Sequence, residues 1–148
     1  MPDILHGFET KSSADQAYQA FATRAGLAGW WTTDTRGETR VGGVIEFVFG
    51  SRGRIEAKVL ELEPGRRVCW QVVAGPAAWI GTKISFELRP RGQYTAVLFK
   101  HEGWKEPQEF MHHCSTKWAT FLMSAKALVE TGTGAPYPND VHITGSGD

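Results

Sequence analysis

Residues 108–131 read QEFMHHCSTKWATFLMSAKALVET, and this stretch decides the fold. It contains no Gly and no Pro, the residues that most often interrupt a helix. At about 100° per residue, its apolar side chains fall within one arc roughly 120° wide, which is broad enough to require an apolar surface beneath it. The arc contains Phe110, Met111, Cys114, Trp118, Phe121, Leu122, Ala125, Leu128 and Val129. The pattern predicts a long helix that lies across a sheet.

The chain before this helix alternates apolar and polar residues in the manner of strands. The clearest run covers residues 80–88, and similar runs lie near 44–49, 55–59, 68–72 and 94–101. Turn signals separate them at Gly50–Gly53, Pro64–Gly65, Gly75–Pro76 and Pro90–Gly92. Because these signals recur about every dozen residues, we expect neighbouring strands to pair antiparallel.

The N-terminal third adds one strand and helical turns. Residues 4–10 alternate as a strand, and Ser13 with Gln16 has the form of a capping box at the start of a helix. Gly26 is the expected C-terminal stop, residues 27–31 form one more short turn, and residues 32–38 form a polar loop.

These elements predict an α+β fold. We expect a curved antiparallel sheet of about six strands wrapped around the long C-terminal helix, with one or two short helices after the first strand. Residues 1–131 would form this single domain, and the Gly- and Pro-rich residues 132–148 a partly ordered tail.

Composition excludes several classes of function. The formal net charge is +0, and no basic run offers a surface for nucleic acid. No segment is apolar enough to span a membrane, and no signal peptide is visible, so we expect a cytoplasmic protein. Two cysteines, Cys69 and Cys114, make no disulfide framework and are expected to be buried.

His101 is the main polar candidate. It shares a strand face with Val97 and Phe99 and ends that strand, so it is a possible hydrogen-bond donor, acid or base. A structural histidine that satisfies a backbone carbonyl is the alternative. His112, His113 and Cys114 point in three directions on a helix, so we expect no metal, and we also expect no cofactor.

Four strings carry a resemblance to a known family: LAGWW (27–31), VGG (41–43), EPGRRV (63–68) and TAVLFKHEGW (95–104). In this order they resemble the bacterial branch of the SRPBCC (START-like, helix-grip) superfamily, in the group homologous to the C-terminal domain of the heat-shock-protein-90 ATPase activator. The resemblance covers about residues 3–131. It implies a long helix gripped by an antiparallel sheet with an apolar cavity between them. The superfamily includes lipid and hormone carriers, polyketide cyclases and proteins without an assigned activity.

The leading hypothesis is a protein that binds a hydrophobic or aromatic small molecule between helix and sheet, with Trp30 and Trp31 as a gate and His101 as the polar anchor. The remaining expected lining residues are Phe47, Phe49, Trp70, Phe86, Phe99, Phe110, Cys114, Trp118 and Phe121. A cyclase or dehydratase that uses His101 is the second hypothesis, and it requires at least two titratable groups to converge inside. A chaperone-associated interaction module is the third, and a homodimer is compatible with all three.

Overall fold

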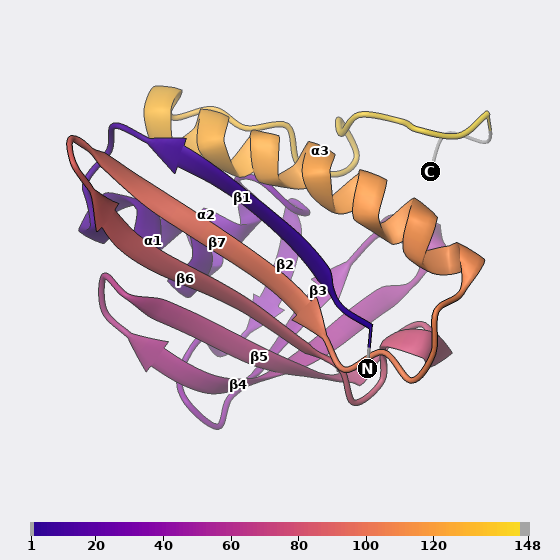
Figure 1. Ribbon diagram of the computed structural model, residues 1–148. Coiled ribbons are helices and arrows are strands. Elements are labelled where there is room, and N and C mark those ends of the chain that lie inside the picture. The colour runs from indigo at the N-terminus through magenta and orange to yellow at the C-terminus, as the bar shows by residue number, and fades with distance from the viewer. Residues whose placement is uncertain (1, 146–148) are drawn as a thin grey trace.

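The computed structural model describes residues 2–145, and its centre is one seven-stranded antiparallel sheet with a long helix across it (Figure 1). The strands are β1 (Ile4–Thr10), β2 (Asp34–Gly37), β3 (Val44–Val48), β4 (Arg54–Glu63), β5 (Arg67–Ala74), β6 (Lys83–Arg91) and β7 (Tyr94–Glu102). The helices are α1 (Ala14–Ala22), α2 (Arg24–Ala28) and α3 (Glu109–Thr131), with short 3₁₀ turns η1 (Gly50–Arg52) and η2 (Ala77–Trp79). The predicted α+β architecture is confirmed.

The order of strands in the sheet is β1-β7-β6-β5-β4-β3-β2. Strands β2 to β7 therefore follow one another as hairpins, while β1 returns to pair with β7 in a register that places Ile4 opposite His101. The β4–β5 register shifts between Glu56 and Ala57 and again between Val59 and Glu61. Because such irregularities bend a strand and increase its twist, they help the sheet to curve around the helix.

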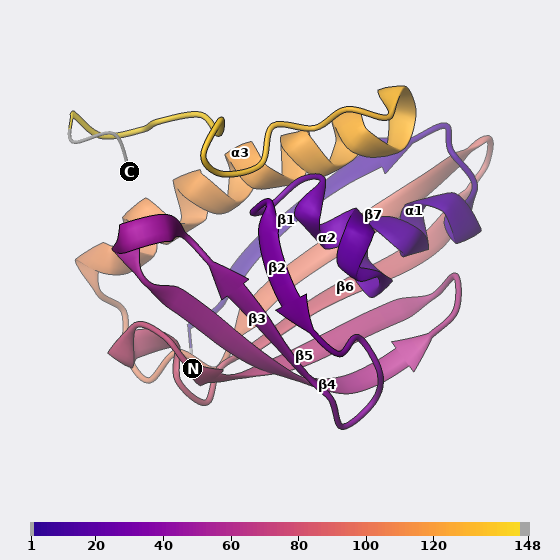
Figure 2. The same cartoon turned by 180° about the vertical axis from the view of Figure 1, so that it is seen from behind.

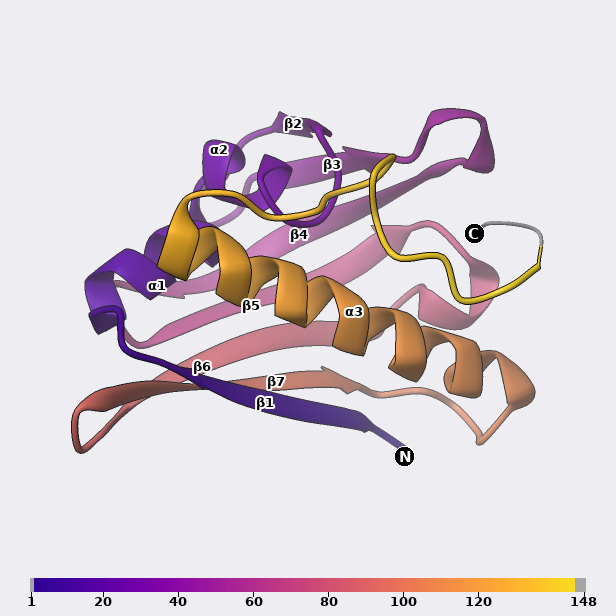
Figure 3. The same ribbon diagram turned by 90° about the horizontal axis from the view of Figure 1, so that it is seen from above.

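Helix α3 lies along the concave side of the sheet, as Figure 3 shows from above. Its buried side chains include Cys114, Trp118, Phe121 and Leu122, which belong to the predicted apolar stripe. Phe110 departs from that stripe, because in the first turn it is 37% exposed. The helix ends at Gly132, whose φ of 86° lies in the left-handed region that favours glycine.

Helices α1 and α2 occupy the stretch where the sequence predicted one helix and a further short turn. The capping box of Ser13 and Gln16 is present, but the first helix ends at Ala22 and not before Gly26. Thr23 caps both helices: its backbone N–H donates to Gln19, and its hydroxyl accepts a bond from the Gly26 N–H at 3.0 Å. A Cβ on Gly26 would lie 2.2 Å from the Gln19 carbonyl oxygen, so this close approach between the helices requires glycine.

Strand β2 was expected to be a loop, and it is the strand beyond the six that the sequence indicated. It pairs with β3 from Asp34 opposite Val48 to Gly37 opposite Ile45. Thr35 is its one buried residue, so the segment lacks the apolar alternation by which strands are recognised. The sequence also placed residues 80–82 in a strand, but η2 precedes them and β6 begins at Lys83.

The segment that follows α3 returns along the outside of the helix toward β2 and β3 (Figure 2). The N–H of Ala135 donates to the Ser124 hydroxyl at 2.7 Å. The N–H of Tyr137 donates to the Trp31 carbonyl at 2.8 Å, and the Tyr137 carbonyl accepts a bond from Thr33 at 3.1 Å. These bonds hold the first part of the C-terminal segment against the domain.

Candidate functional site

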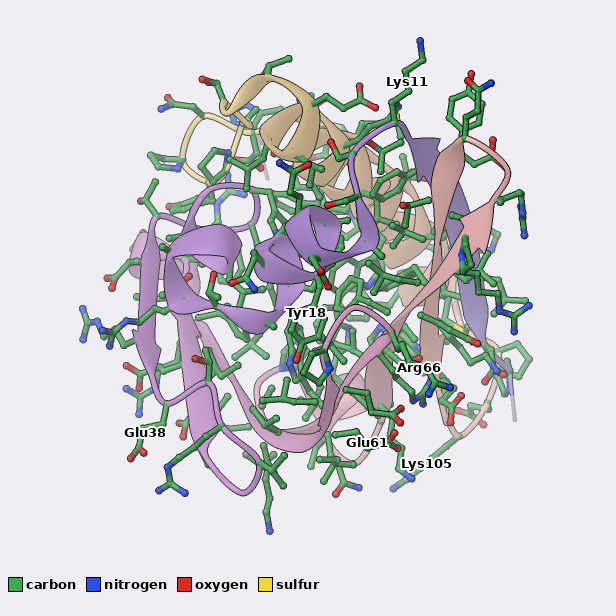
Figure 4. All side chains as sticks on the ribbon, turned by 90° about the vertical axis from the view of Figure 1, so that its left-hand side faces the viewer. Lys11, Tyr18, Glu38, Glu61, Arg66 and Lys105 are labelled. Carbon is green, nitrogen blue, oxygen red and sulfur yellow. The ribbon has the colours of Figure 1, made fainter. Side chains whose placement is uncertain are left out.

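The space between helix and sheet is largely filled with aromatic rings. Trp30, Phe47, Trp70 and Phe86 are each 0% exposed, and Phe99 is 2% exposed. Trp70 and Phe86 have their ring centroids 5.3 Å apart, and Phe86 and Phe99 5.4 Å apart. Figure 4 shows this packed interior, with the labelled charged side chains Lys11, Glu38 and Lys105 at the periphery. These five predicted lining residues therefore form a core and do not surround a cavity.

Trp30 and Trp31 belong to the same core. Trp31 is 3% exposed and stacks on Trp30 with a centroid separation of 5.9 Å. The Trp30 indole N–H donates to the Ala20 carbonyl at 2.8 Å, which ties it to α1. The predicted gate is thus not at the surface, because the Trp31 ring packs against Phe47, Trp70 and Trp118.

His101 is 0% exposed and lies at the centre of a short hydrogen-bond chain. The Trp118 indole N–H donates to His101 Nδ1 at 3.2 Å. The opposite ring nitrogen, Nε2, then carries the proton and donates to the Thr82 hydroxyl at 2.8 Å, which donates in turn to the Trp79 carbonyl. Burial lowers the pKa of His101 from its usual 6.5 to about 3, so the ring is neutral at physiological pH.

This arrangement places His101 among protein partners, whereas the sequence favoured it as the anchor for a ligand. Both ring nitrogens are used by neighbouring side chains, and His101 lines neither of the hollows described below. The contacts resemble those of the structural alternative, although the partners are the side chains of Thr82 and Trp118 and not a backbone carbonyl. His101 positions the Trp118 ring, which does line a hollow.

Two adjoining hollows lie at one end of the interior, under the N-terminal half of α3. The inner one measures about 110 Å³ and the outer one about 260 Å³. Both are lined by Trp31, Trp79, His113, Lys117 and Phe121. The inner hollow adds Phe110, Cys114 and Trp118, and the outer one adds Phe49, Ile55, Pro76, Tyr137, Asp140 and residues 52–54. Together they approach the lower end of the size range for small-molecule sites, roughly 300–1,000 Å³.

The inner hollow is almost wholly apolar. Trp118 stacks on Trp79 with a centroid separation of 5.8 Å, and its ring is tilted by 39° against Trp31 at 4.9 Å. Burial raises the pKa of the Cys114 thiol to about 11, against a smaller opposing effect of the Trp79 indole N–H. Within residues 2–145 that N–H has no oxygen or nitrogen acceptor, and the sulfur beside it is a weak one. The thiol is accordingly protonated and unreactive at neutral pH.

The outer hollow has a polar wall. Lys117 Nζ lies 2.5 Å from Asp140 Oδ2 and 2.5 Å from the Val141 carbonyl oxygen. The two side chains are 14% and 3% exposed, so this ion pair is largely removed from water. Tyr137 completes the wall, with its ring 5.6 Å from that of Phe49 and under the Arg52 guanidinium at 5.8 Å.

Six of the twelve predicted site residues line these hollows. They are Trp31, Phe49, Phe110, Cys114, Trp118 and Phe121. Trp79, Lys117, Tyr137 and Asp140 also contribute and were missed. A turn between Gly75-Pro76 and Gly81 gave no reason to place Trp79 inside, and the composition of residues 132–148 indicated only a tail.

Nothing in residues 2–145 groups three or more His, Cys, Asp or Glu side chains in a way that could hold a metal ion. In the same part of the chain, no helix has the length and apolar character to cross a bilayer.

The architecture defines a helix-grip domain of the SRPBCC type, with its free volume at one end of the grip. A family model described as "Activator of Hsp90 ATPase homolog 1-like protein" matches residues 11–130, and the chain belongs to this family. Among solved structures, the Aha1 dimer from Colwellia psychrerythraea is 44% identical, with a TM-score of 0.81 over 90% of this chain and 100% of that one.

More distant structures share the fold. Protein SSP2350 from Staphylococcus saprophyticus is 14% identical, with a TM-score of 0.73 over 90% of this chain and 95% of that one. CalU16 from Micromonospora echinospora is 17% identical, with a TM-score of 0.69 over 88% and 77%. No curated protein matches the chain.

Proposed function

We propose that this protein binds a small apolar or aromatic molecule in the double hollow under the N-terminal half of α3. The observation that carries the proposal is the contrast between this end and the rest of the interior, which is filled. A ligand ring placed in the inner hollow would contact Trp79, Phe110 and Trp118, and its removal from water would stabilise the complex by about 25 cal/mol per Å² of apolar surface.

The size of the hollows restricts the ligand. A volume of about 110 Å³ holds one small ring, and the outer hollow of about 260 Å³ leaves room for a second ring or a short substituent. An engineered apolar cavity of roughly 150 Å³ is enough to bind benzene in another protein. We therefore propose a compact ligand of one or two rings and not a long lipid.

The proposal is tested in two steps. Native mass spectrometry of the protein purified without denaturation should show a bound small molecule. NMR titration of ¹⁵N-labelled protein with 2-methylnaphthalene should then shift the indole N–H signals of Trp79 and Trp118. Failure of both measurements would overturn the proposal.

A pair of cysteine variants localises the binding. Cys114→Met extends a side chain into the inner hollow, whereas Cys69→Met makes the same change at a buried position that lines neither hollow. The first variant should weaken binding of 2-methylnaphthalene about tenfold or more, and the second should leave it nearly unchanged. Equal effects of the two variants would place the ligand elsewhere.

The cyclase or dehydratase hypothesis requires titratable groups around His101. The side chains that contact its ring are Thr82, Trp79, Trp104 and Trp118, none of which titrates near neutral pH. The depressed pKa of His101 also leaves it a poor base. No observation therefore favours catalysis at His101 over binding.

Association with a chaperone is the second candidate, and the 44% identity with a protein named Aha1 favours it. It predicts that this protein raises the ATPase rate of a bacterial Hsp90. The same relative is a dimer, which supports a homodimer, a state that the sequence is compatible with but does not decide. Light scattering during size-exclusion chromatography would give the oligomeric state.

A further inference from the structure

The C-terminal segment has two parts that are held to the domain in different ways. Residues 135–137, the anchor, are fixed by hydrogen bonds to Ser124, Trp31 and Thr33. Residues 138–141, the strap, contact the domain through Asp140 and Val141, which both meet Lys117 of α3. Within the strap, the Asn139 N–H reaches back only to Pro136 at 2.8 Å.

The strap forms part of the outer wall of the hollow, because Asp140 lines it together with Lys117. A molecule that reaches the inner hollow through the outer one passes this wall or displaces it. Tyr137, on the anchor side, has backbone bonds of its own to Trp31 and Thr33 that do not involve the strap. Among the described residues, the bonds that join the strap to α3 are those of Asp140 and Val141 with Lys117.

The contact that holds the strap is incompletely satisfied. Asp140 Oδ2 pairs with Lys117, but Asp140 Oδ1 is buried and has no hydrogen-bond partner among residues 2–145. A buried acceptor without a partner costs free energy, and a desolvated ion pair gains little net stability over its solvated parts. When the strap lifts, Asp140 returns to water and this cost disappears.

From these contacts we propose that residues 138–141 act as a strap that opens to admit ligand to the hollow, with the Lys117–Asp140 ion pair as its latch. The inference rests on the proposed binding function for its purpose, but the opening itself is a property of the protein without ligand. Opening pivots after Tyr137, while the anchor and the rest of the domain keep their positions.

Hydrogen exchange followed by NMR tests the opening without any ligand. In the unmodified protein, the Asn139 amide should exchange faster than the Ala135 and Tyr137 amides, because opening the strap exposes only the first of these. Asp140→Ala should raise Asn139 exchange about tenfold or more and leave the two anchor amides unchanged. Asp34→Ala is the matched control, because it removes an exposed ion pair with Arg36 and should change none of the three.

The variant Lys117→Met removes the other partner of the ion pair, the lysine of α3. Removing one partner of a buried pair is severe only if the remaining charge stays buried. Since the strap can lift and release Asp140 into water, the urea midpoint should stay close to that of the unmodified protein while Asn139 exchange rises. The proposal that the strap opens would be overturned if Asn139 exchange stayed unchanged in both Asp140→Ala and Lys117→Met. It would also be overturned if exchange at Ala135 and Tyr137 accelerated as much as at Asn139.

Stopped-flow binding of 2-methylnaphthalene separates this inference from the proposed function. The association rate should increase in Asp140→Ala and stay unchanged in Asp34→Ala. If Asn139 exchange responds as expected but the probe binds to none of the three proteins, the opening of the strap is supported and the proposed binding function is overturned. If the probe binds at equal rates to all three proteins, the binding function stands and the strap is not its gate.

Discussion

The two ends of the interior are built from the same kinds of side chain, yet one end is filled and the other is hollow. At the filled end, α1 packs against α3, β5 and β6, and Phe21 stacks on Phe86 with centroids 4.4 Å apart. At the hollow end, no helix takes the place of α1 in residues 2–145. Turns and the C-terminal segment close that end instead, and they carry Trp79, Tyr137 and Asp140. The difference shows that cavity position depends on which layer covers the rings and not on how many rings there are.

The largest expected contrast comes from deleting one ring at each end. Phe86→Ala should lower the free energy of unfolding by roughly 3–5 kcal/mol, because the side chain is fully buried among other rings. Phe110→Ala, at the hollow end, should cost about 1 kcal/mol or less, since Phe110 is 37% exposed. Urea unfolding measures both, and equal losses would show that the two ends are packed alike.

Acid should lower the free energy of unfolding through His101, the residue that holds the Trp118 ring. The pKa of His101 is about 3 in the folded protein against 6.5 in the unfolded chain, so the unfolded chain takes up the proton first. The contribution of His101 to the free energy of unfolding is fully present above pH 6.5. Below that pH it falls by roughly 1.4 kcal/mol per pH unit, which amounts to about 2–3 kcal/mol at pH 4.5.

The variant His101→Gln isolates this contribution from that of the carboxylates. Its free energy of unfolding between pH 7 and pH 4.5 should fall less steeply than that of the unmodified protein. Parallel curves for the two proteins would mean that His101 is already charged in the folded state or is not buried.

Tyr137 tests whether the wall of the hollow belongs to the core. Tyr137→Ala removes the ring contacts with Phe49 and Arg52 but leaves the backbone bonds, so we expect a loss of about 1 kcal/mol. Tyr94→Ala is the control, because Tyr94 is 40% exposed on β7 and should change stability little. A loss as large as that for Phe86→Ala would make the C-terminal segment part of the core.

The smallest effect concerns the rate at which Cys114 reacts. A thiol with a pKa of about 11 is only ~0.1% thiolate at pH 8, so modification by iodoacetamide in the Cys69→Ala background should be slow until the protein unfolds. Saturating 2-methylnaphthalene should slow it further, whereas Cys69 in a Cys114→Ala background should not respond. Fast modification of Cys114 would show that the inner hollow is open to solvent.

The sequence was sufficient to predict the helices and strands whose apolar residues recur with a regular period. The apolar stripe of α3 and the alternation in β3 to β7 predicted the grip, because a broad stripe and a twisted sheet each need the other for burial. Strand β2 escaped detection because it is held by backbone bonds to β3 and buries only Thr35. The sequence allowed one or two short helices here, but it did not show that the break falls at Thr23, since this depends on how Thr23 shares its bonds.

The candidate site was less predictable than the fold. Alternation places Phe47, Trp70 and Phe86 on the inner face, but it does not reveal whether a neighbouring ring fills the space in front of them. Side-chain period also places His101 inside without showing that Trp118 and Thr82 occupy both of its nitrogens. Lys117 falls beside Trp118 on a predicted helix, yet its partner Asp140 lies in a segment with no periodic pattern at all.

The return of β1 to the side of β7 has a consequence for synthesis on the ribosome. Strand β1 is synthesised before the other strands of the sheet, and it has no neighbour until the last of them, β7, has been translated. A nascent chain halted before residue 94 therefore carries Ile4–Thr10 without a pairing strand, together with strands β2 to β6 but without β7 and the helix α3. Such a chain must be shielded or must wait, because β1 can pair only after β7 has been synthesised.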